Sequence, residues 1–323
     1  MLRSALLCIT ISCLVEMGSL DAAETSVYRS PFEVGFSPEG QQLMVSDRTA
    51  GMLVVVDLAT GKVLKEKSTA NQPTGMVLGA SGNHVFVSEY ASETVVEANA
   101  TNGQLIRRIF VGHGPMGLAV AAKKNLLIVC NSSSNDVSLV DITGGKEKTR
   151  IPVVRQPTSV AVTPDETLAL VSNLLPLGDA TDQQTSACVS LIDLDGLKKI
   201  TDIRLPAGST NCRQIAISSD SRWAYIVHTI GRTQQPANEL EGGWLNVHAM
   251  SILDLQSKKL RATVYLDRLT EGAANPWGIV LSPDGKTIWI TLSGVHQLAR
   301  IDREALHDFL DGKPVRMAIE DFE

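Results

Sequence analysis

The sequence predicts an all-β fold, a β-propeller built of four-stranded blades. One pattern occurs six times: a proline, a short apolar run, a turn and a second apolar run that ends in a polar residue. Its anchors are Pro31, Pro73, Pro115, Pro157, Cys212 (in place of proline) and Pro276, at spacings of 42, 42, 42, 55 and 64 residues. A period of about 40 residues, with Val- and Ile-rich segments that partly alternate, is typical of a propeller in which each repeat forms one blade.

The repeat at residues 71–111 shows how one blade is made. We expect strands in the runs PTGMVLGA, HVFVSEY, ETVVEANA and QLIRRIFV, joined by turns rich in Gly and Asn. An acidic residue closes the third strand of each repeat, at Asp57, Glu97, Asp141, Asp193, Asp254 and Asp302. Such side chains accept hydrogen bonds from nearby backbone N–H groups, so we interpret these acids as turn anchors. After the N-terminal segment, one helix is expected, in REALHDFLDG at residues 303–312.

A glycine-rich segment offers an alternative interpretation. Gly112, Gly114 and Gly117 have the G-x-G-x-x-G spacing of a dinucleotide-binding loop. That loop requires a strand before it and a helix after it, so that the N-terminus of the helix faces a pyrophosphate. The residues that follow, LAVAAKKNLLIVCN, form two short apolar runs split by a turn. We therefore interpret the three glycines as turn residues at the start of the third blade.

Segments at both ends of the chain resemble the last strand of a blade: ETSVYRS at residues 24–30 and PVRMAIEDF at residues 314–322. Propellers often close when a strand from one end completes the blade at the other end, which protects exposed strand edges. Two candidates for one outer position favour six blades with an imperfect or open closure, in a frame shaped for seven. A closed six-bladed ring is the alternative.

The first 23 residues have the form of a signal peptide, with a basic start at Arg3 and an apolar run over residues 5–15. We expect residues 24–323 to form a single propeller domain that is periplasmic or secreted. No later segment reaches about 18 consecutive apolar residues, so stable membrane insertion is not expected. The formal net charge is −6, or −5 without Arg3, Glu16 and Asp21. This charge argues against nucleic acid or anionic lipid as a partner, since both require clustered Lys and Arg.

Three cysteines follow residue 23: Cys130, Cys188 and Cys212. A disulfide between Cys188 and Cys212 is one alternative in an oxidising compartment. The other alternative, which we favour, is three buried thiols that act as small apolar side chains.

The pattern of the repeats, P-x-G-x-x-x-S-P-D-G followed by V-x-N and V-S-V-I-D-x-x-T-G-x-V, resembles the YVTN-type, or surface-layer-type, β-propeller repeat over about residues 27–321. GGWLNVHAMSILDL and GAANPWGIVLSPDGKTIWIT resemble the propeller half of exported proteins that carry a cytochrome c or di-haem peroxidase-like half. Those relatives attach haem through C-x-x-C-H, which none of the three cysteines here forms. The resemblance thus implies the fold and a cytochrome c or peroxidase-like protein partner, with no covalent haem on this chain. It implies little about chemistry, because propellers carry many unrelated functions.

A binding site is expected on the face with the longest loops. Repeats four and five exceed 42 residues, and the excess lies at residues 174–187 and 229–248, between the second and third strands of adjacent blades. Long loops on a rigid scaffold usually carry binding. Candidates at the ends of the second strands are Asp47, Glu89, Asn131, Asn173 and His228; those in the turns before the blades are His113, Arg155, Asn211, Arg213 and Asn275; Trp244, His248 and Trp277 complete the set.

Two classes of function are compatible with this pattern. The first, which we favour, is an exported non-enzymatic protein whose looped face binds another protein. The second is a lactonase-like hydrolase, since lactonases share the fold and use acids and His around the channel with a divalent ion. The sequence contains neither H-E-x-x-H nor G-x-S-x-G, and we interpret His113, His228 and His248 as hydrogen-bonded polar residues rather than ligands. We therefore assign no catalytic residue, no metal and no cofactor.

Overall fold

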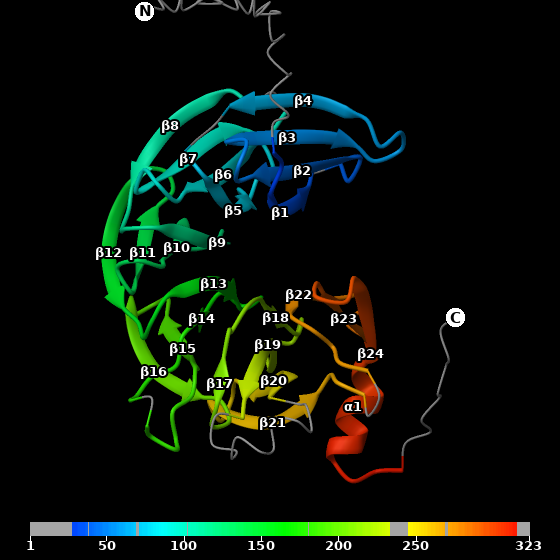
Figure 1. Ribbon diagram of the computed structural model, residues 1–323. Helices are drawn as coiled ribbons and strands as arrows, with labels where there is room; N and C mark the ends of the chain where they lie inside the picture. The colour runs from blue at the N-terminus through cyan, green and yellow to red at the C-terminus, as the bar shows by residue number, and fades with distance from the viewer. Residues whose placement is uncertain are drawn as a thin grey trace, which may run out of the picture.

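The strands form six antiparallel sheets that are arranged in a ring in a computed structural model (Figure 1), which confirms the predicted six-bladed β-propeller. It describes residues 28–37, 39–68, 71–101, 103–179, 181–232, 245–268 and 271–314. Blade 1 contains β1 (Pro31–Phe36), β2 (Gln42–Asp47), β3 (Met52–Asp57) and β4 (Val63–Ser68), and blade 2 contains β5 (Pro73–Leu78), β6 (His84–Glu89), β7 (Thr94–Asn99) and β8 (Leu105–Phe110).

The middle blades follow the same order from the channel outward. Blade 3 contains β9 (Pro115–Ala121), β10 (Leu126–Asn131), β11 (Asp136–Asp141) and β12 (Lys146–Pro152), and blade 4 contains β13 (Pro157–Val162), β14 (Leu168–Asn173), β15 (Cys188–Asp193) and β16 (Lys198–Arg204). In blade 5 the first strand is split into β17 (Ser209–Thr210) and β18 (Ile215–Ile217), followed by β19 (Trp223–Gly231), β20 (Asn246–Asp254) and β21 (Lys259–Tyr265).

Blade 6 is different at its outer edge. Within the described part of the chain it has three strands, β22 (Pro276–Leu281), β23 (Thr287–Leu292) and β24 (Gln297–Asp302). Helix α1 (Arg303–Leu310) follows directly, and the Asp302 side chain caps it by accepting a hydrogen bond of 2.9 Å from the N–H of Ala305. Leu306 and Leu310 pack on the core between blades 5 and 6. The helix predicted within residues 303–312 is therefore confirmed.

Hydroxyl groups on the second strands of blades 1 and 2 bond to the innermost strand of the next blade. Ser46 Oγ donates to the carbonyl of Thr74 at 2.6 Å, and Ser88 Oγ donates to the carbonyl of Met116 at 2.7 Å. The strands approach so closely that a Cβ added to Gly75 would lie 2.2 Å from the Met116 carbonyl oxygen. The blades are thus held in contact at the axis by short side chains and by glycine.

The glycine-rich segment lies where blade 3 begins, and β10 follows β9 without a helix, which excludes the dinucleotide alternative. Gly114 has a φ of +63°, and the equivalent residues Gln72, Gln156, Asn211 and Asn275 have φ values of 57°, 49°, 55° and 55°. The turn before each of these blades therefore needs the left-handed conformation that glycine adopts without strain. The prediction that Gly117 is a turn residue is wrong, because this glycine lies inside β9. A Cβ at this position would stand 2.6 Å from the Thr158 carbonyl oxygen.

Most acids at the ends of the third strands anchor turns as predicted. Asp57 accepts from the N–H of Thr60 at 2.8 Å, and Asp141 accepts from the N–H of Gly144 at 2.6 Å. The prediction for Glu97 is wrong, because β7 runs two residues further and Asn99 occupies the turn position. The carboxylate of Glu97 instead pairs with Arg107 of β8. This register error arose because both positions in the repeat carry polar residues.

Consecutive blades bury apolar cores between their sheet faces, from blades 1 and 2 through blades 5 and 6. Blade 2 shows the pattern, because side chains alternate between the two faces of a strand. Val77, Phe86 and Val95 pack against blade 3. Met76, Leu78, Val85, Val87, Val96 and Ala98 pack against blade 1.

No such core joins blade 6 to blade 1 among the residues that the structure describes. The positions of blade 1 that match the second set are Val34, Phe36, Leu43, Val45, Val54 and Val56, and those of blade 6 that match the first set are Val280, Trp289 and Leu298. We call these nine side chains the seam. Val34, Phe36, Val280 and Leu298 are 55%, 60%, 56% and 57% exposed, whereas Phe86 and Val95 are 0% exposed. Among the described residues, the seam is therefore open at the rim of the ring, and Val54 is its buried exception at 7% exposed.

The three cysteines of the described residues are buried free thiols, so the alternative without a disulfide is correct. Burial raises the pKa of the Cys188 thiol to about 12. The predicted signal peptide, and all but Pro314 of the C-terminal strand candidate, lie outside the described residues. In the part of the chain that is described, no helix has the length and apolar character needed to cross a membrane.

Candidate functional site

The innermost strands of the six blades surround a central channel (Figure 1). The cavity in this channel measures about 300 Å³ and is lined mainly by apolar side chains. The polar side chains in its wall are Glu33, Thr158, Ser159, Arg213 and Gln214. Because the wall is formed by every blade, a site here depends on closure of the ring at the axis.

Four of the predicted site residues meet at the inner end of blades 5 and 6. The guanidinium carbon of Arg213 lies 3.8 Å from the centre of the Trp277 ring, which is a cation–π contact. Asn211 Nδ2 donates to Oδ1 of Asn275 at 3.4 Å. Phe32 of β1 approaches Trp277 edge to face, with ring centroids 6.5 Å apart and planes at 86°. This aromatic contact joins blade 6 to blade 1 at the axis.

The Arg213 side chain places a buried hydrogen-bond donor in the channel wall. Its Nε atom is buried and has no hydrogen-bond partner among the described residues. Burial lowers the pKa of Arg213, but an arginine remains protonated at neutral pH. A buried donor without an acceptor is costly, so it points to a missing partner.

Glu33 and Gln214 place opposing groups in the same channel. Glu33 Oε1 accepts from Gln214 Nε2 at 3.4 Å, and Gln214 Oε1 accepts from the N–H of Ile279 at 3.2 Å. Gln214 therefore links blades 1, 5 and 6. Desolvation by burial raises the pKa of Glu33 to about 7, because the charged form loses its contact with water.

Sequence reasoning missed Phe32, Glu33 and Gln214. A signal was present, since Glu33 and Gln214 each lie two residues after the anchor of their repeat. The same position holds Gly75, Gly117, Ser159 and Gly278 in the other four repeats. A long polar side chain at a position otherwise kept small is directed into the space that the small residues leave open.

The ends of the second strands are instead buried inside their own blades. Asp47 accepts from the N–H of Ser30 at 3.0 Å, and Asn131 Nδ2 donates to Asp136 at 2.7 Å. Asn173 Nδ2 donates to Ser190 Oγ at 3.0 Å. Glu89 is similarly buried and forms an ion pair of 3.1 Å with Arg108. Their bonds to neighbouring strands hold each blade together.

His228 is also enclosed within its blade. Its Nε2 atom lies 2.8 Å from Ser251 Oγ, and its Nδ1 atom has no partner in the described structure. Burial lowers the pKa of His228 to about 4, so the ring is neutral at pH 7. A neutral buried histidine of this kind acts as a polar core residue.

The remaining candidates lie apart from one another, with His113 and Arg155 in turns and His248 in β20. His113 Nδ1 contacts Glu93 Oε1 at 2.6 Å, and His248 Nδ1 contacts Asp267 Oδ1 at 3.2 Å. Arg155 donates to the carbonyl of Pro176 at 3.5 Å, in the long loop of blade 4. Trp244 lies outside the described residues. Within the described ranges, no three or more His, Cys, Asp or Glu side chains are grouped so as to hold a metal ion.

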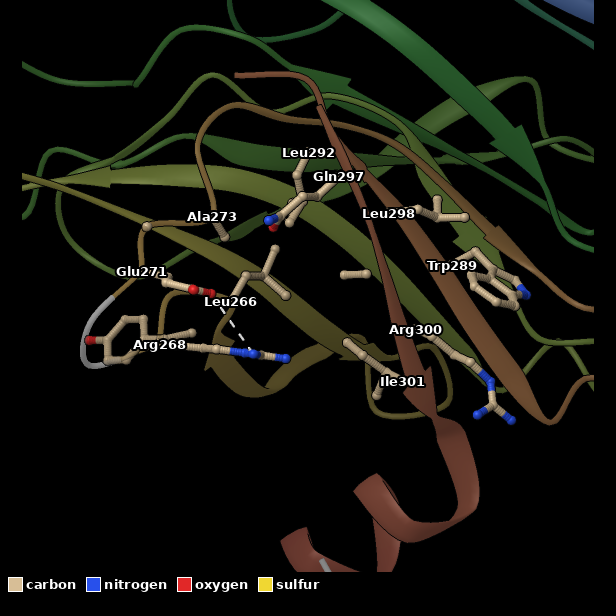
Figure 2. A pocket seen from close by; sticks show the side chains of 13 residues that line it. Leu266, Arg268, Glu271, Ala273, Trp289, Leu292, Gln297, Leu298, Arg300 and Ile301 are labelled. Carbon is tan, nitrogen blue, oxygen red and sulfur yellow. Dashed lines mark ion pairs between the residues drawn. The ribbon is translucent and has the colours of Figure 1, made fainter. Parts of the chain in front are cut away.

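A second hollow of about 580 Å³ runs along β24, facing the last strand of blade 5 (Figure 2). Leu266 and Ala273 line it, and Arg268 and Glu271 form an ion pair of 3.8 Å there. Figure 2 shows Trp289, Leu298 and Arg300 on the other side of β24 from Leu266 and Ala273. Because Trp289 and Leu298 line the hollow as well, the hollow extends to the seam.

These features define the class of protein: a β-propeller with an open seam at its rim and a polar cluster in its channel. No family model matches the chain. Over 106 residues, or 33% of this chain, the sequence is 26% identical to hydrazine synthase subunit beta of Kuenenia stuttgartiensis, and the match spans 28% of that relative. A solved structure of Kuenenia stuttgartiensis hydrazine synthase is similar with a TM-score of 0.80 at 22% identity, covering 92% of this chain and 84% of that chain. The structural likeness shows the fold.

Proposed function

We propose that this protein is a non-enzymatic binding subunit that holds another protein. The open seam carries this proposal, because contiguous apolar surface on a folded protein usually marks an interaction site. Phe36 and Leu298 are 60% and 57% exposed at positions that other blades cover with a neighbouring sheet. A partner that covers both faces of the seam removes this surface from water.

Two further observations support a role in an assembly. The similar curated protein is itself named as a subunit, of hydrazine synthase. In addition, the second and third strands of blade 5, β19 and β20, have nine residues each, so this blade projects further than its neighbours. We propose the looped face of blades 4 and 5 as a second contact surface. The YVTN-type resemblance supports export and a cytochrome c or peroxidase-like partner, and both belong to this proposal.

The hydrolase alternative has no observation in its favour. Its acids and histidines would have to converge on the channel, whereas Asp47, Glu89 and His228 are enclosed in separate blades. The described channel wall contains two titratable side chains, Glu33 and Arg213. One acid and one arginine do not form the ligand set of a divalent ion.

The test compares assemblies isolated through a tag on the full chain from cells that make the protein. One variant combines Phe36→Ser with Leu298→Ser in the seam. The control is Phe110→Ser, which alters a side chain 77% exposed on the outer strand of blade 2. We expect the partner to remain with the wild type and the control and to be lost from the seam variant.

Hydrogen exchange on the purified assembly supplies the second readout. We expect β1 and β24 to be protected in the assembly and to lose that protection when the partner is removed. Equal exchange of both strands with and without the partner contradicts the seam as the contact. Deletion of residues 233–243 then tells whether the looped face contributes, since that deletion leaves the seam unchanged.

A further inference from the structure

The channel contains a positive charge that the described protein does not neutralise. Arg213 stacks on Trp277 at 3.8 Å, and its buried Nε atom has no acceptor. Stacking fixes the plane of the guanidinium, which leaves its edge to form paired hydrogen bonds in the geometry that suits a carboxylate. The position of the side chain is therefore settled before any ligand arrives.

The rest of the wall limits what such a ligand can be. The cavity of about 300 Å³ has room for a few non-hydrogen atoms and their hydration, and Met76, Met116 and Leu118 line it together with the indole of Trp277. A ligand with an apolar end gains by removing that surface from water. Thr158 and Ser159 add hydroxyl groups on the side of blade 4.

We propose that the channel binds a small monocarboxylic acid, with its carboxylate on Arg213 and its apolar end against Trp277, Met76 and Met116. Val280 is the one seam residue in the wall of this cavity, and none of the residues proposed to contact the ligand belongs to the seam, so the site goes beyond the proposed binding function. Arg213 is the single cationic side chain in the described wall. One positive charge in this cavity balances one negative charge, and a doubly charged anion would leave one charge buried without compensation.

Glu33 makes this binding depend on pH. It faces Gln214 of blade 5, and the described channel wall offers Arg213 as the one other titratable group, since the contributions of blades 2, 3, 4 and 6 are not titratable. Burial raises the pKa of Glu33 to about 7, so below that pH its carboxyl group is neutral and can donate a hydrogen bond to a bound carboxylate. Above that pH the ionised Glu33 repels the ligand. Affinity therefore falls as pH rises through about 7.

The experiment uses the full chain and sodium butyrate, with butylamine and inorganic phosphate as comparison ligands. The readout is the indole N–H signal of Trp277 in NMR spectra, assigned with Trp277→Phe. We expect a saturable shift with butyrate. The affinity should be about tenfold lower above pH 8 than at pH 5.5, because each pH unit above the pKa of Glu33 lowers the fraction of its neutral form about tenfold. Butylamine and phosphate should leave the signal in place.

Two variants and a control decide the outcome. Arg213→Met keeps a long, unbranched side chain and removes the charge. We expect it to lower the affinity for butyrate by about ten- to a hundred-fold, which is the effect of a charged hydrogen bond. Arg300→Met, on β24 outside the channel, should leave affinity unchanged. Glu33→Gln should bind at pH 8 as tightly as the wild type does at pH 5.5.

The proposal fails if butyrate causes no saturable shift, if phosphate competes equally well, or if Arg213→Met binds like the wild type. If Arg213→Met does not fold, the pH profile of butyrate binding to Glu33→Gln decides. A purely structural role for Glu33 predicts that Glu33→Gln and the wild type have the same pH dependence of affinity. None of these results depends on the seam, since the measurement needs no partner protein.

Discussion

Truncating two leucines at corresponding interfaces tests whether the seam is open in solution. Leu139 is 0% exposed in the core between blades 3 and 4, whereas Leu298 of the seam is 57% exposed. Leu→Ala in a packed core costs about 2–5 kcal/mol, from lost transfer free energy and the cavity left behind. Full burial of a leucine is worth about 1.5–3 kcal/mol, and Leu298 is less than half buried, so Leu298→Ala should cost about 1 kcal/mol or less.

The assay is urea unfolding of the full chain at low micromolar concentration. The measured quantity is the change in the free energy of unfolding between variants that share the same dependence of this free energy on urea concentration. We expect Leu139→Ala to lower that free energy by at least twice as much as Leu298→Ala. Equal losses for the two variants would refute the open seam, because they would mean that Leu298 is covered in solution. The measurement is repeated at tenfold higher protein concentration. If Leu298→Ala lowers the free energy of unfolding more at the higher concentration, a second copy of the chain covers Leu298.

Three further outcomes follow from the structure. Gly75→Ala should cost about 1–3 kcal/mol or more, because its Cβ would stand 2.2 Å from the Met116 carbonyl oxygen, whereas Gly35→Ala, with its Cβ 3.4 Å from the nearest side chain, should be nearly neutral in the same urea assay. His228 has a folded pKa of about 4, below its unfolded value of 6.5, so its contribution to stability is complete above pH 6.5 and is lost as pH falls toward 4. His228→Gln should therefore flatten the stability curve over that range, and an unchanged acid slope would contradict the assignment. A thiol reagent should modify Cys130, Cys188 and Cys212 only after unfolding, because all three are buried.

The repeat pattern predicted the blades because its signals are local. A proline, a left-handed turn residue and alternating Val and Ile each act over a few residues, so the anchors at Pro31, Pro73 and Pro115 coincide with the first residues of β1, β5 and β9. The register of single polar residues was less certain. Glu97 and Asn99 are both polar and two residues apart, and their roles differ because the turn begins only after Asn99.

The channel site could be predicted only in part, because it is assembled from distant repeats. The contact between Gln214 and Glu33 joins residues 181 positions apart. The sequence analysis included Arg213 and Trp277, which directly follow blade anchors, among the candidates, but it could not tell which polar side chains turn inward. Asp47 and His228 illustrate this, because strand ends next to a loop are equally suited to line a channel or to be buried in a blade.

The seam and the channel share strand β1. Val34 and Phe36 face the seam, while Phe32 and Glu33, next to the register shift between Pro31 and Glu33, line the channel. Across the axis, β1 is joined to Trp277 by one edge-to-face contact, worth about 0.5–1.5 kcal/mol, and to Gln214 by one hydrogen bond of 3.4 Å. Among the described residues, no apolar core like those between the other neighbouring blades supports this closure of the ring, so we expect it to be the weakest one. A partner that packs on Val34 and Phe36 therefore stabilises the strand that positions Glu33, and the amides of β1 report on both surfaces at once.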